Sequence, residues 1–114
     1  MKKLLKTLLL TLAMPLAAQA QGWPTSYEGV MLQGFYWDSF KETRWTKLQK
    51  QAPDYNGYFS LVWLPQSGKT NGGQSMGYDP YYFFNHNSSF GTTDELRSLI
   101  NTFRTNNIGA IADV

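Results

Sequence analysis

The residues best suited to chemistry in this sequence lie just after its apolar segments, where a chain leaves a strand and enters a loop. They are Trp37, Asp38, Tyr78, Asp79, His86 and Asp113. Aromatic rings can stack on flat ligands, and carboxylates accept hydrogen bonds. The chain carries four Trp, seven Tyr and seven Phe. This composition suits a protein that binds flat, partly apolar ligands such as sugar rings, although core packing uses the same residues.

The loop that holds most of these candidates runs from Gln66 to about Phe90 without a periodic pattern. Connections longer than roughly 12–15 residues are usually either functional or disordered. Disordered segments are poor in aromatic residues, yet this loop contains Tyr78, Tyr81, Tyr82, Phe83, Phe84 and Phe90. We therefore predict an ordered loop, without regular secondary structure, that packs on itself and presents some rings to a ligand.

Three apolar segments have the character of strands. Residues 30–37, 58–64 and 108–114 are apolar or aromatic without clean polar alternation, which is typical of parallel strands buried on both faces. They predict a first, second and third strand of one sheet.

Two helices are expected between these strands. The first spans Glu42 to Ala52, with Ser39 and Glu42 at capping-box spacing and Pro53 as its end. In the second, Thr92 and Glu95 form a capping box, apolar residues follow at helical spacing, and Asn106-Asn107 ends the helix. The apolar residues are Leu96, Leu99, Ile100 and Phe103.

Alternating strands and helices predict an α/β fold with parallel strands and right-handed crossovers. In parallel α/β sheets, ligands bind at the carboxyl ends of the strands. That rule places all of the candidate residues on one rim of the sheet, and it places Gly57 and Asn107 on the opposite, stability-related side. Two free sheet edges and a half-covered apolar face would remain, so we expect the chain to be the front of a longer protein.

Residues 1–20 have the pattern of a secretory signal peptide. Lys2, Lys3 and Lys6 precede a short apolar stretch, and Ala18-Gln19-Ala20 offers a small-x-small cleavage site. A membrane anchor is the alternative, but the apolar stretch is short for a bilayer. We predict a secreted or periplasmic protein with residues 21–114 as its mature part, which does not associate with the membrane after cleavage.

Removal of that segment leaves seven basic against eight acidic residues, a net charge of −1. This balance gives no nucleic-acid footprint. The chain has no cysteine, so no disulfide supports it.

Two short motifs are set aside. Ser67-Gly68-Lys69-Thr70 resembles the end of a phosphate-binding loop, but Trp63 stands where that motif requires glycine. The sequon Asn87-Ser88-Ser89 is short enough to arise by chance.

Five blocks in order resemble the opening of the α-amylase family, glycoside hydrolase family 13. They cover Val30–Trp37, Val62–Pro65, Gly77–Tyr81, Phe90–Thr92 with Glu95-Leu96, and Ile108–Val114. The resemblance implies a (β/α)8 TIM barrel, of which this chain would form the N-terminal part, about three βα units. It also implies a retaining hydrolase of α-1,4-linked glucans, in which one aspartate attacks the sugar and a glutamic acid protonates the leaving oxygen.

The resemblance assigns roles to two residues. Tyr78 matches the family tyrosine that stacks on glucose at the cleavage subsite, with a loop tyrosine packing on its neighbours as the alternative. Asp113 matches a family aspartate that organises the site by pairing with an arginine, with a strand-end aspartate capping nearby amides as the alternative. The family's catalytic carboxylates follow strands four, five and seven, so no catalytic residue is assigned in this chain, which we expect to be inactive by itself.

The resemblance also implies calcium, a monomer, and an α-glucan polysaccharide or oligosaccharide as partner, with no metal ligand in this chain.

Among the other candidates, we expect His86 to pack in the loop or face solvent, and Asp79 to bond the loop backbone. Gln33 and Trp37 are expected to serve core packing, with lining of the cleft as the alternative for Trp37. Tyr82 departs from the family, which often has aspartate there. A family transglycosylase or isomerase and a non-catalytic starch-binding protein remain alternatives.

Overall fold

The computed structural model describes residues 28–114, so the predicted signal peptide at residues 1–20 lies outside the described residues. The elements follow in the order β1 (Met31–Gln33), α2 (Trp45–Tyr55), β2 (Leu61–Trp63), β3 (Lys69–Thr70), β4 (Pro80–Tyr82), α3 (Thr93–Thr105) and β5 (Gly109–Ile111). Helices and strands alternate around one small parallel sheet, which confirms the predicted α/β organisation and is compatible with part of a barrel.

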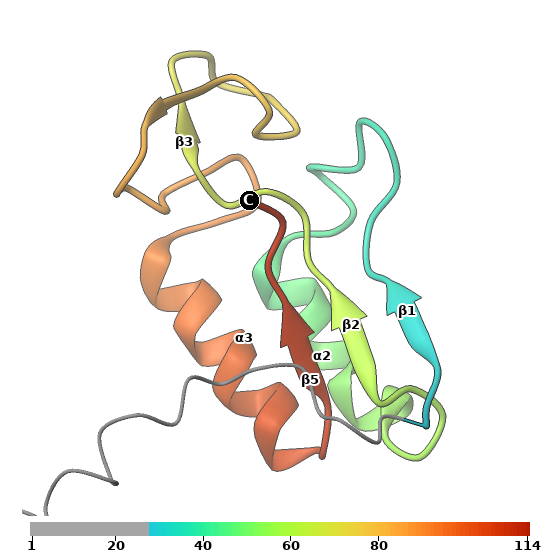
Figure 1. The fold of residues 1–114 in the computed structure, drawn as a ribbon. Helices are drawn as coiled ribbons and strands as arrows, with labels where there is room; N and C mark the ends of the chain where they lie inside the picture. Colours follow the sequence, from blue (N-terminus) through green and yellow to red (C-terminus); the bar gives the residue numbers. More distant parts are fainter. Residues whose placement is uncertain (1–27) are drawn as a thin grey trace, which may run out of the picture.

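The parallel sheet has the strand order β1-β2-β5. Leu32 is in register with Val62, and Val62 with Ala110. All three arrows in Figure 1 point the same way, so their carboxyl ends share one rim beneath the long loop. Gly57 and Asn107 lie at the opposite rim, where both adopt positive φ in the turns that enter β2 and β5. The predicted strand direction is therefore confirmed.

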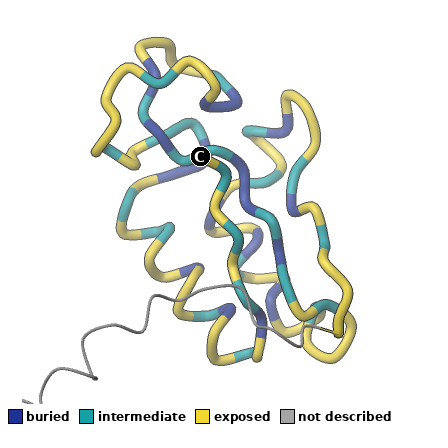
Figure 2. The backbone as a smooth tube through the Cα atoms, in the orientation of Figure 1, coloured by how far each residue is buried: buried dark blue, intermediate teal, exposed yellow. Residues whose placement is uncertain are grey.

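Both helices pack on the same face of the sheet. Consecutive neighbouring strands joined by crossovers of one hand place their helices on one side, and Figure 1 shows α2 behind the strands with α3 beside β5. The buried core lies between these layers, and dark segments in Figure 2 mark it. Its fully buried members include Trp45, Ala52, Val62, Leu99 and Phe103.

The other face of the sheet is open within the described residues. Met31 and Gln33 of β1 are exposed, and Leu61 and Trp63 of β2 are only partly covered. The prediction that these strands are buried on both faces is therefore wrong for this part of the chain, because both helices cover the same side.

Helix α2 begins later than predicted, and its capping differs. The residue before it, Arg44, makes no side-chain cap. Ser39 instead closes a tight turn, in which its carbonyl accepts hydrogen bonds from the backbone N–H groups of Glu42 and Thr43 at 2.9 and 2.8 Å. The first N–H of the helix, on Trp45, donates to the carbonyl of Phe90 at 2.9 Å. A partner distant in sequence thus replaces the capping box expected at Ser39 and Glu42.

Helix α2 also continues past Pro53, which was expected to end it. Proline in a helix interior removes a hydrogen bond and crowds the preceding turn. Here Pro53 lies in the last turn, and the carbonyl of Tyr55 accepts hydrogen bonds from the N–H groups of Tyr58 and Phe59 at 3.0 Å each. The chain therefore closes the helix beyond the proline.

Helix α3 matches its prediction closely. The Thr92 hydroxyl accepts a hydrogen bond from the N–H of Glu95, and the Glu95 carboxylate accepts one from the N–H of Thr92, so the capping box is complete. Asn106 follows the last helical residue, and Asn107 leaves with φ 58°. Gln49 of α2 donates to Ser98 and Thr102 of α3 at 2.9 and 3.0 Å, which ties the two helices together.

The long loop contains regular structure that its sequence did not predict. β3 and β4 form an antiparallel ribbon with an irregular register. The N–H of Lys69 donates to the carbonyl of Asn85 at 2.8 Å, and the Lys69 ammonium lies 5.5 Å from the centre of the Tyr82 ring. Strands this short give little periodicity, so the pattern of alternation could not identify them.

The layer between the helices and the sheet can be tested at α3. Leu99→Ala should lower the free energy of unfolding by about 2–5 kcal/mol, because it leaves a cavity beside fully buried neighbours. Ile100→Ala on the same helix is the matched control, since Ile100 is 41% exposed and should cost much less. Urea denaturation of the two variants measures the difference, and equal losses would contradict this arrangement of the core.

Candidate functional site

Tyr78 and Asp113 meet at the rim where the parallel strands end. The Tyr78 hydroxyl donates a hydrogen bond to Oδ2 of Asp113 at 2.6 Å, although 35 positions separate the two residues. Tyr78 comes from the loop that follows β2, and Asp113 lies two residues beyond β5. The direction of the strands predicted this meeting, and the structure confirms the placement. The roles of the two residues remain predictions.

Gly77 allows the loop to present Tyr78 at this position. Its φ is +95°, and a Cβ at this position would lie 2.6 Å from the carbonyl oxygen of Gln66. A side chain at residue 77 would therefore be strained and would collide with the backbone that leaves β2. Ser75 supports the same turn: its hydroxyl binds the Asp79 carboxylate and accepts a hydrogen bond from the N–H of Gly77 at 3.0 Å.

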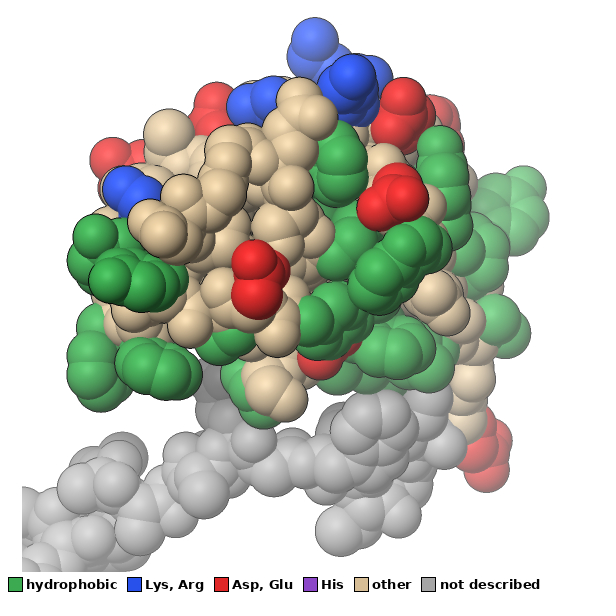
Figure 3. All heavy atoms as spheres, turned by 90° about the horizontal axis from the view of Figure 1, so that it is seen from above, with side chains coloured by type: hydrophobic (Ala, Val, Ile, Leu, Met, Phe, Trp, Pro, Cys, Tyr) green, Lys and Arg blue, Asp and Glu red, His purple; other side chains and the backbone are tan. Residues whose placement is uncertain are grey.

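Trp37 joins this pair from the loop after β1. Its ring lies nearly parallel to that of Tyr78, at 7°, with 6.1 Å between the ring centres. The indole is 70% exposed and Tyr78 is 52% exposed. Core packing was the expectation for Trp37, and the structure contradicts it. Viewed from above the rim, hydrophobic side chains gather next to acidic ones (Figure 3).

The other candidate residues have local partners. Asp79 accepts a hydrogen bond from the hydroxyl of Ser75, so its partner lies within the loop, as expected, but is a side chain and not the backbone. His86 Nδ1 lies 2.9 Å from the Ser67 hydroxyl, and this hydrogen bond connects the beginning and the end of the long loop. Gln33 is exposed and its amide donates to the carbonyl of Phe35 at 3.1 Å, so the core-packing role expected for it is wrong.

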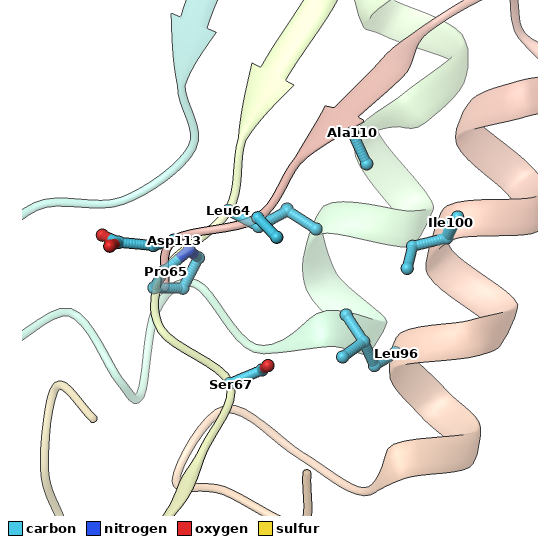
Figure 4. A pocket seen from close by; sticks show the side chains of 8 residues that line it. Leu64, Pro65, Ser67, Leu96, Ile100, Ala110 and Asp113 are labelled. Carbon is cyan, nitrogen blue, oxygen red and sulfur yellow. The ribbon is translucent and has the colours of Figure 1, made fainter. Parts of the chain in front are cut away.

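A small apolar cavity lies beside the site, between β5 and α3. Its volume is about 140 Å³, and its lining includes Leu64, Leu96 and Ile100. In Figure 4 the carboxylate of Asp113 points away from these side chains, whereas the side chain of Ser67 points towards Leu96. The cavity therefore belongs to the helix layer, and the polar chemistry lies on the other side of Asp113.

Within residues 28–114, no group of three or more His, Asp or Glu side chains is placed to hold a metal ion. Neither helix of the described region combines the length and the apolar character needed to cross a membrane.

Sequence reasoning missed how the turn after β1 positions Trp37. The signal lies in the residues that follow the tryptophan, because Asp and Ser often form tight turns. Asp38 adopts φ 63°. The N–H of Tyr36 donates to the Ser39 hydroxyl at 3.1 Å, and the N–H of Ser39 donates back to the carbonyl of Tyr36 at 3.1 Å. Trp37 lies within this turn and its side chain is exposed.

The chain is similar to plant α-amylases. Over 86 residues it is 35% identical to Alpha-amylase 3, chloroplastic, of Arabidopsis thaliana, a match that covers 74% of this chain and 10% of that protein. It is 30% identical over 86 residues to Probable alpha-amylase 2 of the same plant, covering 75% of this chain and 20% of that protein. The chain therefore spans about a tenth and a fifth of the length of these relatives. No protein-family model matches it.

These similarities identify an α-amylase-like region that covers about three quarters of the chain. The resemblance seen in the sequence is supported at that level. Within this region, the parallel sheet places Tyr78 and Asp113 on one rim.

The shared hydrogen bond changes how Tyr78 ionises. It raises the pKa of Tyr78 to about 12, from an ordinary value of 10.0, and partial loss of hydration and the negative charge of Asp113 act in the same direction. Because the folded pKa lies above the unfolded one, this contribution to stability is complete below pH 10.0 and is lost as the pH rises through about 12.

An absorbance titration of tyrosinate tests this bond. We expect a phenol that ionises near pH 12, absent in Tyr78→Phe and shifted towards 10.0 in Asp113→Asn, because an amide oxygen is a weaker hydrogen-bond acceptor than a carboxylate and carries no charge. Tyr81→Phe is the matched control, since Tyr81 lies on the exposed loop ribbon and its loss should leave the late step intact. Persistence of that step in Tyr78→Phe would contradict the assignment.

Proposed function

We propose that this chain belongs to the α-amylase family of glycoside hydrolases and forms the N-terminal part of a (β/α)8 barrel that hydrolyses α-1,4-linked glucans. The observation that carries the proposal is the hydrogen bond of 2.6 Å between Tyr78 and Asp113. It joins two different strand-to-loop segments at the rim where parallel α/β proteins bind ligands. The similarity to plant α-amylases supports the choice of substrate class.

In this proposal the chain's own residues bind and orient the substrate. The exposed ring of Tyr78 offers a face to the apolar side of a glucose unit. Asp113 holds the phenol through its hydroxyl, so the ring is fixed before the sugar arrives, and binding costs less entropy than it would with a free side chain. Oδ2 receives the Tyr78 bond, and the other carboxylate oxygen can accept a hydrogen bond from a neighbouring group.

Bond cleavage is assigned to other residues of the whole protein. Retaining glycosidases use two carboxyl groups about 5–5.5 Å apart, one as nucleophile and one as acid and base. The proposal assigns no catalytic residue within these 114 positions. Calcium is likewise proposed only for the whole protein: the side chains of residues 28–114 do not provide a cluster suited to it, and no step is derived through it.

The decisive experiment uses the protein made from its complete reading frame, with starch and maltoheptaose as substrates. We expect release of maltooligosaccharides whose new reducing ends first appear in the α-configuration, as a retaining mechanism requires. Tyr78→Ala should lower kcat/KM by about tenfold or more, because a stacking contact of about 0.5–1.5 kcal/mol is lost together with buried area. Proton NMR records the configuration, and a reducing-sugar assay records the rate.

Tyr58→Ala is the matched control for this experiment. Tyr58 is 75% exposed and precedes β2, at the rim opposite Tyr78, so its loss should leave kcat/KM unchanged. Transfer of glucosyl units to an acceptor would favour the transglycosylase alternative, and glucan binding without turnover would favour a starch-binding protein. Failure to bind any α-glucan would overturn the proposal.

We also propose that the protein is exported, with cleavage after Ala20. The support is the sequence of residues 1–20, with its basic start, apolar stretch and small-x-small site. Protein recovered from the periplasm or the medium should begin at Gln21 by N-terminal sequencing. Ala18→Arg should accumulate as an uncleaved precursor because it blocks the small-residue site. Recovery of cytoplasmic protein that begins at Met1 would refute export.

A further inference from the structure

The turn after β1 holds a large aromatic side chain in the open. Trp37 is 70% exposed, and leaving an indole in water forgoes the substantial free energy that its burial would bring. Trp45, in contrast, is completely buried a few positions later, at the start of α2. The fold thus buries Trp45 in the core and leaves Trp37 exposed on the rim.

The exposed position is fixed by hydrogen bonds within the turn itself. Ser39 is fully buried, and its hydroxyl lies 2.9 Å from the hydroxyl of Thr43 and accepts the N–H of Tyr36. The Thr43 hydroxyl also donates to the carbonyl of Ser39 at 2.9 Å. These bonds satisfy the polar groups of the turn without any contribution from the indole, so Trp37 is displayed on a rigid support.

The turn also contains backbone strain. Asp38 has φ 63°, a left-handed conformation that is costly for a residue with a side chain, although Asp tolerates it better than most. Strain of this kind persists where the surrounding structure imposes it, and it is common at ligand sites. Here the strained residue is the one that directly follows Trp37.

The surroundings of Trp37 indicate the chemistry of its ligand. Its ring is parallel to that of Tyr78 within 7°, and the Tyr78 hydroxyl is bound to Asp113. Asp38 and Asp79 flank the two rings in sequence and are exposed. Asp113 at the Tyr78 hydroxyl, with Asp38 and Asp79 next to the two aromatic residues in sequence, gives the site negative charge that repels phosphates and other anions, and carboxylates accept hydrogen bonds from hydroxyl groups. A neutral ring that carries many hydroxyl groups fits both features.

We infer that Trp37 is a second sugar-binding residue, which stacks on the glucose unit next to the one held by Tyr78. The inference rests on the proposed function, because it names a further contact for the same α-glucan. Trp37 contributes affinity along the glucan chain and takes no part in bond cleavage. Its rigid turn makes this contact ready before the ligand binds.

The test measures binding of maltoheptaose to the protein made from its complete reading frame, by calorimetry. Trp37→Ala should raise Kd by about tenfold, whereas Trp37→Phe, which keeps an aromatic face, should raise it by less than about threefold. Tyr58→Ala is again the matched control, because it removes an equally exposed ring from the opposite rim. Its Kd should equal that of the unmodified protein.

A second readout separates sugar contact from support of the fold. Bound maltoheptaose should shield tryptophan fluorescence from acrylamide in the unmodified protein, and this shielding should be clearly smaller in Trp37→Phe. A variant that is merely less stable would show a lower Tm with the same shielding. The combination of weaker binding and lost shielding is the expected result.

The outcomes distinguish this inference from the proposed function. If Tyr78→Ala weakens binding while Trp37→Ala and the shielding in Trp37→Phe match the unmodified protein, the inference is wrong and the proposed function stands. If the unmodified protein does not bind maltoheptaose at millimolar concentration, the proposed function is wrong and the inference is wrong with it.

Discussion

The pairing of β2 with a parallel strand on each side is the constraint on which the rest of the structure depends. The ladder continues beyond the strands: the N–H of Gly34 donates to the carbonyl of Trp63, and the N–H of Leu64 donates to the carbonyl of Ile111, each at 2.9 Å. These bonds fix the exits of all three strands. Because the exits share one rim, loops far apart in the sequence must meet there, and the hydrogen bond from Tyr78 to Asp113 is the result.

A second contact, between two buried aromatic rings, holds the long loop close to that rim. Trp45 and Phe90 are both fully buried, with their ring centres 5.2 Å apart, so the end of the loop is packed against the start of α2. Gly91 follows with φ +143°, and a Cβ at this position would lie 2.7 Å from the indole of Trp45. Only glycine fits there, and this close approach lets α3 begin directly after the loop.

Much of this fold was predictable because its determinants are local. The capping box at Thr92 and Glu95 and the apolar spacing of α3 lie within a few residues of each other, and they gave the helix correctly. The alternation of strands and helices predicted parallel strands. Their shared direction in turn predicted that Tyr78 and Asp113 lie on the same rim. The start of α2 was not predictable in the same way, since its first N–H is satisfied by Phe90, whose position depends on the folded loop.

The errors at Trp37 and in the loop have a common cause. A tryptophan beside a strand is usually part of the core, but this one is exposed and lies in a turn that the hydrogen bonds of Ser39 close. The β3 and β4 ribbon consists of two and three residues, too few for periodicity to identify. In both places the outcome is decided by side-chain contacts that a one-dimensional pattern does not contain.

The outer end of the loop differs from its anchored parts. Asn71 to Gln74 are exposed, and a Cβ built at Gly72 or Gly73 would meet no atom within 4 Å. Thr70 and Met76, on either side, are buried. Natural variation in length can therefore accumulate at this bend without disturbing the rim where Tyr78 and Asp113 meet, and a fluorescent dye or an affinity tag can be attached there for the same reason.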